Sequence, residues 1–430
     1  MKIVGIDIGT TSICGIVLDG ESGRVLRSKT INSNAFLKGC APWEKIQSPE
    51  KIISIAMGIL SELLDEHTAA IGVTGQMHGI VYLDREGTAI SPLYTWQDER
   101  GNQPYKETTY AKYLGSFSGY GNVTDFYNRE NGIRPAEAVN YCTIQDYLVM
   151  KLCGQKTPCL HTSNGASFGL YDLEKNTFSY EVELEVTGDY KIAGTYQGTP
   201  VGLAIGDNQA SVFSTLAEQD QVLLNVGTGS QVSIISDSVL HGEDLEVRPY
   251  FDNRFLVVGS ALCGGRAYSM LKDFYREVLG YIVTVDDEQV YAMMDRMLET
   301  MERTSLKVDP RFAGTRREEG RTGSITGITT GNFHPGEFTL GVLEGMAAEL
   351  YAMYLQMNCR KTGLVGSGNG IRKNKNLMKL AEQMFDMKLR IPLHMEEASY
   401  GAALYAGIAA GCWKNSKEAQ KCICYVDEER

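Results

Sequence analysis

Residues 5–19 read GIDIGTTSICGIVLD, and residues 224–237 read LNVGTGSQVSIISD. Each stretch has an apolar strand, a turn rich in glycine and threonine, and a second apolar strand, and Asp7 of the first aligns with Asn225 of the second. Such tight turns let backbone N–H groups and hydroxyls reach phosphate oxygens, because glycine removes the side chain that would block the approach. A single copy would also fit an ordinary hairpin. The pair predicts two related domains that hold a nucleotide between them.

Length and composition set the broad class. A chain of 430 residues exceeds the range of a single core, so two domains are expected. The net charge of −12 argues against nucleic acid or an anionic membrane as the main partner. No apolar run approaches the roughly 18 residues that span a bilayer, and MKIVGIDIG enters a strand without a signal-peptide layout. We therefore expect a cytoplasmic protein.

Strands and helices alternate along the first half of the chain, which predicts a mixed sheet with helices packed on it. From about Tyr196 the pattern restarts with a Gly/Pro-rich stretch, so the predicted domains are 1–199 and 200–430. The stretch 309–335 is expected to be rich in loops. The predicted strands are 2–6, 13–18, 25–31, 70–74 and 80–83, and the predicted helices are 49–67, 140–152, 208–216, 267–278, 287–303, 340–358, 376–385 and 399–411.

Two carboxylates stand beside the predicted phosphate turns. Asp7 comes directly before the first turn, where it could hold Mg2+ against phosphate oxygens or, alternatively, only cap the turn. Asp207 lies at a loop-to-helix transition, where it is either a helix N-cap, a catalytic base, or both. Phosphoryl transfer needs one carboxylate that orients the attacking oxygen. We expect Asp207 to take the proton of a sugar hydroxyl and Gly206 to leave room for substrate.

Two further segments have the composition of a sugar site. Gln76, Met77 and His78 stand between glycines after a buried strand, an open loop that presents polar groups to a ligand. Trp96 and Asp98 combine an indole with a carboxylate, and aromatic faces meet the C–H groups of sugars while carboxylates bind their hydroxyls. A lone histidine or tryptophan is more often structural. Together these residues predict substrate binding.

The expected nucleotide contacts come from four glycine-rich segments. The segment 366–369 follows an apolar lead-in and precedes a helix, which suits a loop that passes close to a flat ligand such as adenine, and the segment 264–265 could do the same; a plain helix-entry loop is the alternative for both. The full set of predicted cofactor-binding residues is Gly9, Thr10, Thr11, Ser12, Gly227, Thr228, Gly229, Gly264, Gly265, Gly366, Ser367, Gly368 and Asn369.

In this order along the chain, the segments resemble the FGGY carbohydrate kinases, and the likeness spans essentially the whole sequence. The resemblance implies a two-domain, actin-like (ribonuclease H-like) α/β fold with sugar and ATP in the cleft between the domains. It implies that Asp207 is the general base and also touches the sugar, that Asp7 is the carboxylate on the metal side, and that Gln76, Met77, His78, Trp96 and Asp98 form the sugar pocket. The second signature of the family is altered at 376–383, which affects the adenosine contacts.

Within the family the chain most resembles the sedoheptulokinases, through 95–98 (TWQD), 118–121 (SGYG) and 368–374 (GNGIRKN). This likeness implies an ATP- and Mg2+-dependent kinase that phosphorylates the terminal hydroxyl of a ketose, most simply sedoheptulose to its 7-phosphate. The alternatives are a xylulose, ribulose or polyol kinase, or a chaperone- or filament-type ATPase on the same scaffold. The expected partners are a small sugar and ATP, with a homodimer left open.

Overall fold

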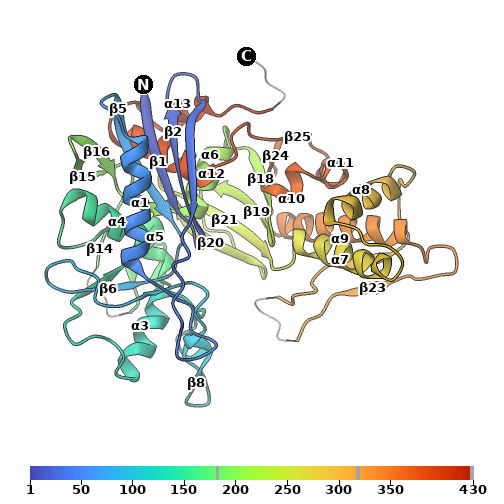
Figure 1. Ribbon diagram of the computed structural model, residues 1–430, viewed down its shortest axis with the longest axis horizontal. Coiled ribbons are helices and arrows are strands. Elements are labelled where there is room, and N and C mark those ends of the chain that lie inside the picture. The colour runs from blue at the N-terminus through green and yellow to red at the C-terminus, as the bar shows by residue number, and fades with distance from the viewer. Residues whose placement is uncertain (181–183, 316–319, 427–430) are drawn as a thin grey trace. The chain divides into compact units, whose positions relative to one another are not determined.

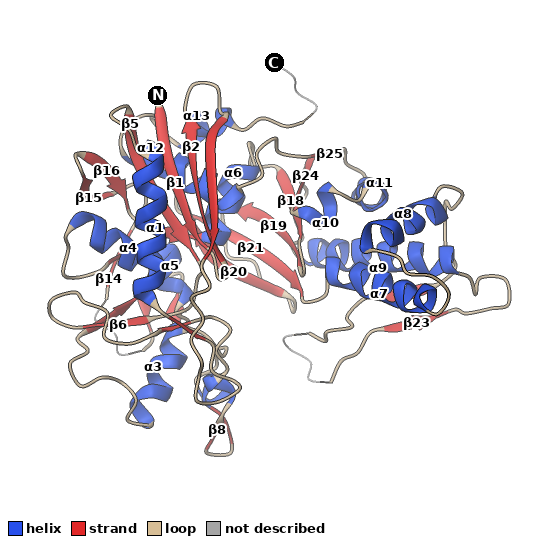
Figure 2. Ribbon diagram, viewed as in Figure 1, coloured by secondary structure: helices blue, strands red, loops and turns tan. Residues whose placement is uncertain are grey.

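The structure is a computed structural model that describes residues 1–180, 184–315 and 320–426 (Figure 1). The chain divides into two compact units. The first unit comprises Met1–Ala217, Arg248–Arg254 and His394–Cys424, and the second comprises Glu218–Val247, Phe255–Leu393 and the residues from Tyr425 onward. Each unit is built around its own mixed sheet, flanked by helices (Figure 2).

The seven-stranded sheet of the first unit has the order β15-β16-β5-β1-β2-β3, and β17 pairs with β5 as well. The first hairpin forms as predicted, because β1 and β2 are antiparallel neighbours, while β5 and β17 run parallel to β1 and to β5 respectively. The strands are β1 (Lys2–Ile8), β2 (Ser12–Asp19), β3 (Val25–Asn32), β5 (Thr68–Gly75), β15 (Ile192–Tyr196), β16 (Thr199–Gly202) and β17 (Ile205–Gly206).

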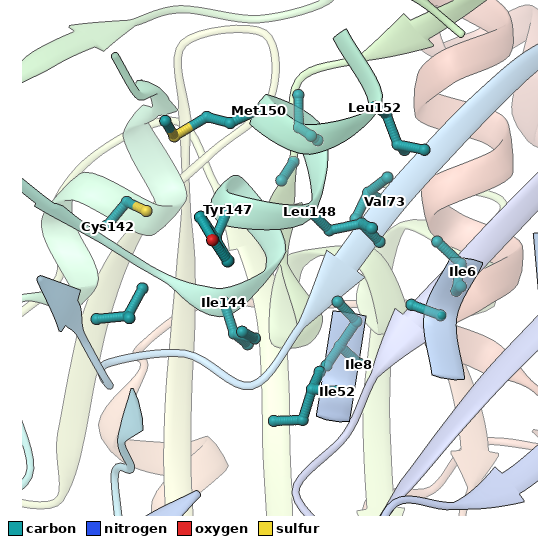
Figure 3. Packing of buried hydrophobic residues seen from close by; sticks show 14 of the residues in the cluster. Ile6, Ile8, Ile52, Val73, Cys142, Ile144, Tyr147, Leu148, Met150 and Leu152 are labelled. Atoms are coloured by element: carbon teal, nitrogen blue, oxygen red, sulfur yellow. The ribbon is translucent and has the colours of Figure 1, made fainter. Parts of the chain in front are cut away.

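The core of the first unit lies on the sheet face that carries Val4, Ile6 and Ile8. Helix α1 (Pro49–Leu63) packs here with its buried apolar stripe, and α4 (Ile144–Cys153) adds further buried side chains (Figure 3). Local signals start both helices. Ser48 caps α1 and is followed by proline at the first helical position, and Thr143 caps α4.

Helix α12 (Glu397–Ala409), near the end of the chain, packs against β1 and β5 of the first unit. The two strands present glycines to this helix. A Cβ on Gly5 would lie 1.9 Å from the carbonyl oxygen of Ser399, and one on Gly72 would lie 1.9 Å from that of Ala402. Because successive strand residues alternate between faces, α12 covers the face of β1 opposite the α1 core.

The sheet of the second unit has the order β20-β21-β19-β18-β24-β25. The second predicted hairpin also forms, with β18 antiparallel to β19 and parallel to β24. The elements are β18 (Gln221–Val226), β19 (Ser230–Ser236), β20 (Leu245–Tyr250), β21 (Arg254–Ala261), β24 (Gly363–Ser367), β25 (Leu389–Arg390), α7 (Gly265–Gly280), α8 (Asp287–Leu298), α9 (Pro335–Gln356), α10 (Asn369–Arg372) and α11 (Lys375–Phe385).

Shorter elements complete both units. In the first unit they are β4 (Ile46–Gln47), β6 (Val81–Leu83), β7 (Leu93–Tyr94), β8 (Pro104–Tyr105), β9 (Thr108–Thr109), α2 (Tyr110–Tyr113), α3 (Gly121–Glu130), β10 (Asn140–Cys142), β11 (Cys159–His161), α5 (Thr162–Ser167), β12 (Tyr171–Asp172), β13 (Thr177–Phe178), β14 (Glu185–Thr187), α6 (Asp207–Thr215) and α13 (Ser416–Ala419), and in the second β22 (Lys307–Asp309) and β23 (Ser324–Thr326).

Two expectations differ from the structure. The compact units divide after Ala217 rather than at 199/200, because β16, β17 and α6 pack on the first sheet, so Asp207 belongs to the first unit. The predicted helix 140–152 begins as strand β10 and becomes helical only after the Thr143 cap. In the predicted loop-rich stretch 309–335, residues 316–319 lie outside the described residues. In the described part of the chain, no helix is both long and apolar enough to cross a bilayer.

Candidate active site

Three parallel strands of the first unit end side by side. The register aligns Ile8 at the end of β1 with Gly75 on β5, and Gly75 with Gly206 on β17. The carboxyl ends of neighbouring parallel strands are where α/β sheets bind ligands. The first phosphate turn, the loop beginning at Gln76, and Asp207 therefore start from one edge of one sheet.

Asp207 is the first residue of α6, and Gly206 occupies the N-cap position. The interpretation of Asp207 as the N-cap residue is therefore displaced by one position. Its Oδ1 still accepts the backbone N–H of Asn208 at 2.7 Å, which fixes the direction of the carboxylate. Burial raises the pKa of Asp207, while the hydrogen bonds from Asn208 and the positive charge of Arg248 act in the opposite direction. Such a carboxylate can accept a proton.

Gly206 makes room for protein rather than for substrate. A Cβ at this position would lie 2.8 Å from the Sδ atom of Met77 and 2.6 Å from Oε1 of Gln209. Met77 itself is buried. The predicted sugar loop is thus packed directly against the residue that precedes Asp207.

The Asp7 carboxyl is buried, and one of its oxygens, Oδ1, has no hydrogen-bond partner among the described residues. Burial first, and then the negative charges of Asp207 and Glu396, together raise the pKa of Asp7 to about 8. An orphaned carboxylate oxygen among like charges suits a bound cation, because a cation would stabilise the ionised form. Asp7 therefore fits the predicted role on the metal side.

His78 combines an unusual backbone with a defined ring orientation. Its φ of 73° lies in the left-handed region, which non-glycine residues rarely adopt and which clusters at functional sites. The ring stacks on Tyr120 with centroids 4.2 Å apart, and Nδ1 lies 2.7 Å from the carbonyl oxygen of Ser167. A carbonyl oxygen only accepts, so Nδ1 carries the proton, and Nε2 of the neutral ring is a hydrogen-bond acceptor.

Gln76 and Trp96 are joined to the first phosphate turn through Thr10. The indole N–H of Trp96 donates to the Thr10 hydroxyl at 2.9 Å, and that hydroxyl lies 3.4 Å from Oε1 of Gln76. Gln47 donates to the carbonyl oxygen of Thr10 at 2.6 Å and accepts from Gln76 at 2.9 Å. Gln76 and Gln47 are buried, whereas Trp96 is 42% exposed. Of these side chains, Trp96 presents a surface to a ligand.

Asp98 is engaged within the protein. The Arg100 guanidinium contacts both carboxylate oxygens, at 2.6 and 3.1 Å, and the backbone N–H of Lys45 donates to Oδ2 at 3.0 Å. Asp98 and Arg100 are both buried. This geometry gives Asp98 a role in holding the loop that carries Trp96, and its contact with a sugar remains a prediction.

The second Gly-Thr turn lies against the start of α7. The backbone N–H of Gly265 donates to the carbonyl oxygen of Gly227 at 2.9 Å, and that of Arg266 donates to Thr228 at 3.0 Å. A Cβ on Gly264 would lie 2.5 Å from the carbonyl carbon of Gly229. Two predicted segments therefore meet, and the N-terminus of a 16-residue helix is a suitable place for an anion.

The segment 366–369 spans the end of β24, the strand that pairs with β18 just before the second turn. Gly366 and Ser367 are still in the strand, and Ser367 is buried and accepts from Asn225 Nδ2 at 2.8 Å. Gly368 has a φ of 78°, and its Cβ would lie 2.6 Å from the carbonyl oxygen of Val226. The turn toward the ligand side thus begins at Gly368 and Asn369 rather than at Gly366.

A set of buried polar residues next to this site was not predicted from the sequence. They are Gln47 and the residues in and before α5, namely His161, Ser163, Asn164 and Ser167. The available signal was the polar run HTSNGAS at 161–167 between apolar segments, which is unusual for a core. It carries no periodicity, so it reads as an ordinary loop.

Comparison with known proteins places the chain. Residues 2–120 match the N-terminal domain, and residues 222–410 the C-terminal domain, of the FGGY family of carbohydrate kinases. The sequence is 27% identical to sedoheptulokinase of Mus musculus over 93% of this chain and 96% of the relative.

Solved structures show the same fold. A xyloylose kinase from Brucella ovis superposes with a TM-score of 0.85 at 18% identity, over 99% of this chain and 94% of that one. Glycerol kinase of Plasmodium falciparum with ADP gives a TM-score of 0.75 at 18% identity, over 98% and 92% of the two chains. The predicted actin-like α/β fold is thereby confirmed. The chain belongs to the FGGY family of carbohydrate kinases, phosphotransferases that use ATP and act on sugar hydroxyl groups.

Proposed function

We propose that this kinase transfers the γ-phosphoryl group of ATP to the terminal hydroxyl of sedoheptulose, giving sedoheptulose 7-phosphate and ADP. The mouse relative named sedoheptulokinase, which aligns over nearly its whole length, supports the substrate. One observation supports the chemistry most strongly. The strand register places the first phosphate turn, the loop at Gln76 and Asp207 at the same edge of one sheet.

Asp207 acts as the general base in this proposal. The sugar hydroxyl oxygen forms a bond to the γ-phosphorus, the bond from that phosphorus to the β–γ bridging oxygen breaks, and the hydroxyl proton passes to Asp207. The contact with Asn208 holds the carboxylate in one direction, so little reorganisation is needed. The raised pKa of Asp207 favours acceptance of the proton.

Asp7 is the residue that we assign to Mg2+. Within the described residues no three His, Cys, Asp or Glu side chains are grouped to enclose a metal ion. A magnesium ion bound with nucleotide is usually held by one or two carboxylates, phosphate oxygens and water, which agrees with the single orphaned oxygen of Asp7. When bound, the ion supplies positive charge to the phosphate oxygens.

The remaining roles follow from the geometry of each unit. We assign phosphate binding to the turns 9–12 and 227–229, with the N-terminus of α7 beside the second turn. We assign sugar contacts to His78, whose ring is oriented by Tyr120 and Ser167, and to Trp96, whose exposed indole offers an apolar face to sugar C–H groups.

A panel of acceptors tests the substrate. ADP release is measured in a coupled assay with sedoheptulose, xylulose, ribulose, glycerol and no acceptor. We expect the highest kcat/KM with sedoheptulose. A higher value for another acceptor would make this a different kinase of the family, and strong turnover without acceptor would favour an actin-type ATPase.

Substitution of the base tests the mechanism. Asp207→Asn is expected to lower kcat at least about 10²-fold, because general-base catalysis typically contributes 10²–10⁴-fold, while the Kd for MgADP stays close to that of the parent enzyme. Asp19→Asn, at the half-buried end of β2 away from the first turn, is the matched control and should turn over normally. Retained turnover in Asp207→Asn would contradict the assignment.

A further inference from the structure

A network of buried hydrogen bonds ends at the backbone N–H of Gly206, the residue before Asp207. His161 and Ser163 are fully buried, and neither belongs to the substrate-facing residues described above. The hydroxyl oxygen of Ser163 accepts the backbone N–H of Gly206 at 3.0 Å. The same hydroxyl lies 2.8 Å from Nδ1 of His161, whose Nε2 lies 2.9 Å from Oδ1 of Asp189.

The donors and acceptors of this chain can be assigned. The backbone N–H of Ser163 donates to Nδ1 of His161 at 3.1 Å, so Nδ1 is an acceptor and the ring proton is on Nε2. Nε2 therefore donates to Asp189. The Ser163 hydroxyl donates its own proton to Nδ1, which leaves its oxygen lone pairs directed to Gly206. Asp189 is fixed in turn, because its Oδ2 accepts the backbone N–H of Asp252 at 2.6 Å.

A second arm of the same short helix holds the strand ends. Nδ2 of Asn164 donates to the carbonyl oxygen of Ala204 at 3.1 Å and to Oδ1 of Asp146 at 3.0 Å. Nε2 of Gln145 lies 3.1 Å from Oδ1 of Asn164 and 3.3 Å from the carbonyl oxygen of Gly75. Asn164 thus binds the segment before Asp207 directly and the end of β5 through Gln145.

The far end of α5 holds the sugar loop. The hydroxyl of Ser167 accepts the backbone N–H of His78 at 3.2 Å, and its carbonyl oxygen accepts the Nδ1 proton of His78. Helix α5, Thr162–Ser167, therefore holds both the segment before the predicted base and the predicted sugar-binding loop. Because Ser163 and Asn164 are fully buried, they act on these segments through hydrogen bonds and not by touching substrate.

We infer that His161 and Ser163 are positioning residues for phosphoryl transfer, which hold the Gly206–Asp207 backbone at the distance from the His78 loop that in-line attack requires. The inference rests on the proposed role of Asp207. Misplacement of a reacting group by about 1 Å can cost on the order of 10²-fold in rate. We therefore expect loss of this hydrogen-bond network to lower kcat in a protein that still folds.

Ser163→Ala removes the acceptor of the Gly206 N–H and is the direct test. The matched control is Ser214→Ala, which removes an equally buried hydroxyl from α6 whose partner is the carbonyl oxygen of Ser211, 2.9 Å away in the same helix. We expect Ser163→Ala to lower kcat about 10- to 100-fold with the KM for ATP within twofold, and Ser214→Ala to keep the parent kcat. Melting temperatures of both variants are measured alongside.

A spectroscopic readout follows the hydrogen bond itself. Only Gly9, Gly72 and Gly206 follow an isoleucine in this sequence. Protein labelled with 13C-carbonyl isoleucine and 15N-glycine therefore gives three amide cross-peaks in a carbonyl-filtered experiment. In Ser163→Ala one cross-peak, that of Gly206, should move upfield in the proton dimension, and Gly9 and Gly72 should stay. In Ser214→Ala all three should stay.

The outcomes separate this inference from the proposed function. A shifted Gly206 peak with reduced kcat supports it, and a parent-like kcat or an unmoved peak in Ser163→Ala overturns it. Asp207→Asn tests the base on its own, so an inactive Asp207→Asn beside a fully active Ser163→Ala would refute only the positioning role. If Ser163→Ala does not fold, Ser163→Cys keeps the size and a weak acceptor and should show an intermediate kcat, whereas parent-like turnover would again refute the role.

Discussion

The two Gly-Thr turns align residue by residue, yet they are held and charged differently. In the first unit, the carbonyl oxygen of Thr10 is bound by the side chain of Gln47, and Asp7 has a buried oxygen with no partner. In the second unit, the carbonyl oxygen of Thr228 is bound by the backbone of α7, and Asn225 is paired with Ser367. The residue before the second turn is a neutral amide with a protein partner, whereas the residue before the first is a carboxyl whose buried oxygen has none and whose ionised form a bound cation would stabilise.

The strands behind the turns differ as well. Gly5 of β1 aligns with Leu223 of β18, two residues before Asp7 and Asn225 respectively. Leu223 is a buried core residue, while Gly5 admits the backbone of α12. A repeated motif has therefore kept its backbone and changed its side chains, because each copy packs against a different neighbour.

The strongest test makes the first turn resemble the second. Asp7→Asn should lower kcat about 10²–10³-fold, the usual cost of losing one charge-stabilising group at a reacting centre. The reciprocal variant Asn225→Asp is the control. It should leave kcat within about tenfold and instead raise the KM for ATP, because a carboxylate would face phosphate and lose the donor to Ser367. Parent-like turnover in Asp7→Asn would show that the first turn needs no charge.

The next effect concerns the strand behind the first turn. Gly5→Ala should lower the free energy of unfolding by about 3 kcal/mol, because the added Cβ meets the backbone of α12 and cannot be relieved by a side-chain rotation. Gly58→Ala in α1 is the matched control. A Cβ there has nothing within 4 Å, so stability should rise by about 0.5–1 kcal/mol. Urea unfolding of both variants measures the contrast, and equal values would refute the close packing.

The charge of Asp7 should also make stability depend on pH. Its pKa is raised to about 8 in the folded protein, so the unfolded chain loses this proton near pH 4 while the folded chain retains it. Stability is therefore lost as pH rises from about 4 to 8 and changes no further above that. Relative to Asp7→Asn, the parent protein should lose about 3–4 kcal/mol between pH 5 and pH 8, as measured by urea unfolding at each pH.

The same titration predicts a coupling to metal. MgADP should raise the melting temperature more at pH 8 than at pH 6, because protons and Mg2+ compete for the Asp7 carboxylate. ADP with EDTA should show a smaller difference, and Asp7→Asn none. An equal MgADP effect at both pH values in the parent protein would contradict the assignment of Asp7.

The smallest expected effect concerns the hydrogen bond from Trp96 to Thr10 in the first turn. Trp96→Phe removes the donor to Thr10 but keeps an aromatic face, so the KM for the ketose should rise about two- to fivefold, equivalent to roughly 0.5–1 kcal/mol for one hydrogen bond. Trp43→Phe, whose indole packs against Tyr127, is the control and should leave this KM unchanged. An unchanged KM in Trp96→Phe would remove the indole donor from the site.

Local signals predicted much of the fold. Both hairpins, the helix started by Ser48 and Pro49, and the loop at Gln76 follow from periodicity, caps and glycine, which act over a few residues. The division of the chain was not predictable in this way. The first sheet takes in β16 and β17 through long-range pairing with β5, which no local pattern encodes.

The site was predicted in part for the same reason. Asp7, Asp207 and the glycine turns stand out because their types and spacing suit phosphate chemistry. Gln47 and Ser163 do not stand out, since each is one polar residue whose partner lies far away in sequence, 37 and 43 residues from Thr10 and Gly206 respectively. Asp98 also stands out by its residue type, and the sequence did not reveal that Arg100 engages its carboxylate, so its contact with a sugar stays a prediction.

Helix α12 has a consequence for how the protein is made. The first unit is assembled from three stretches, and the last, His394–Cys424, supplies the helix that seals one face of the first sheet. After Ala217 the ribosome must add 192 further residues (409 − 217) before that helix is complete at Ala409, which at about 5–20 residues per second takes roughly 10–40 s. During this interval the glycine-lined face of β1 and β5 is bare. We therefore expect newborn chains to cover this face of the first sheet only after 394–424 has been made, and termination before residue 394 to leave the first unit without α12.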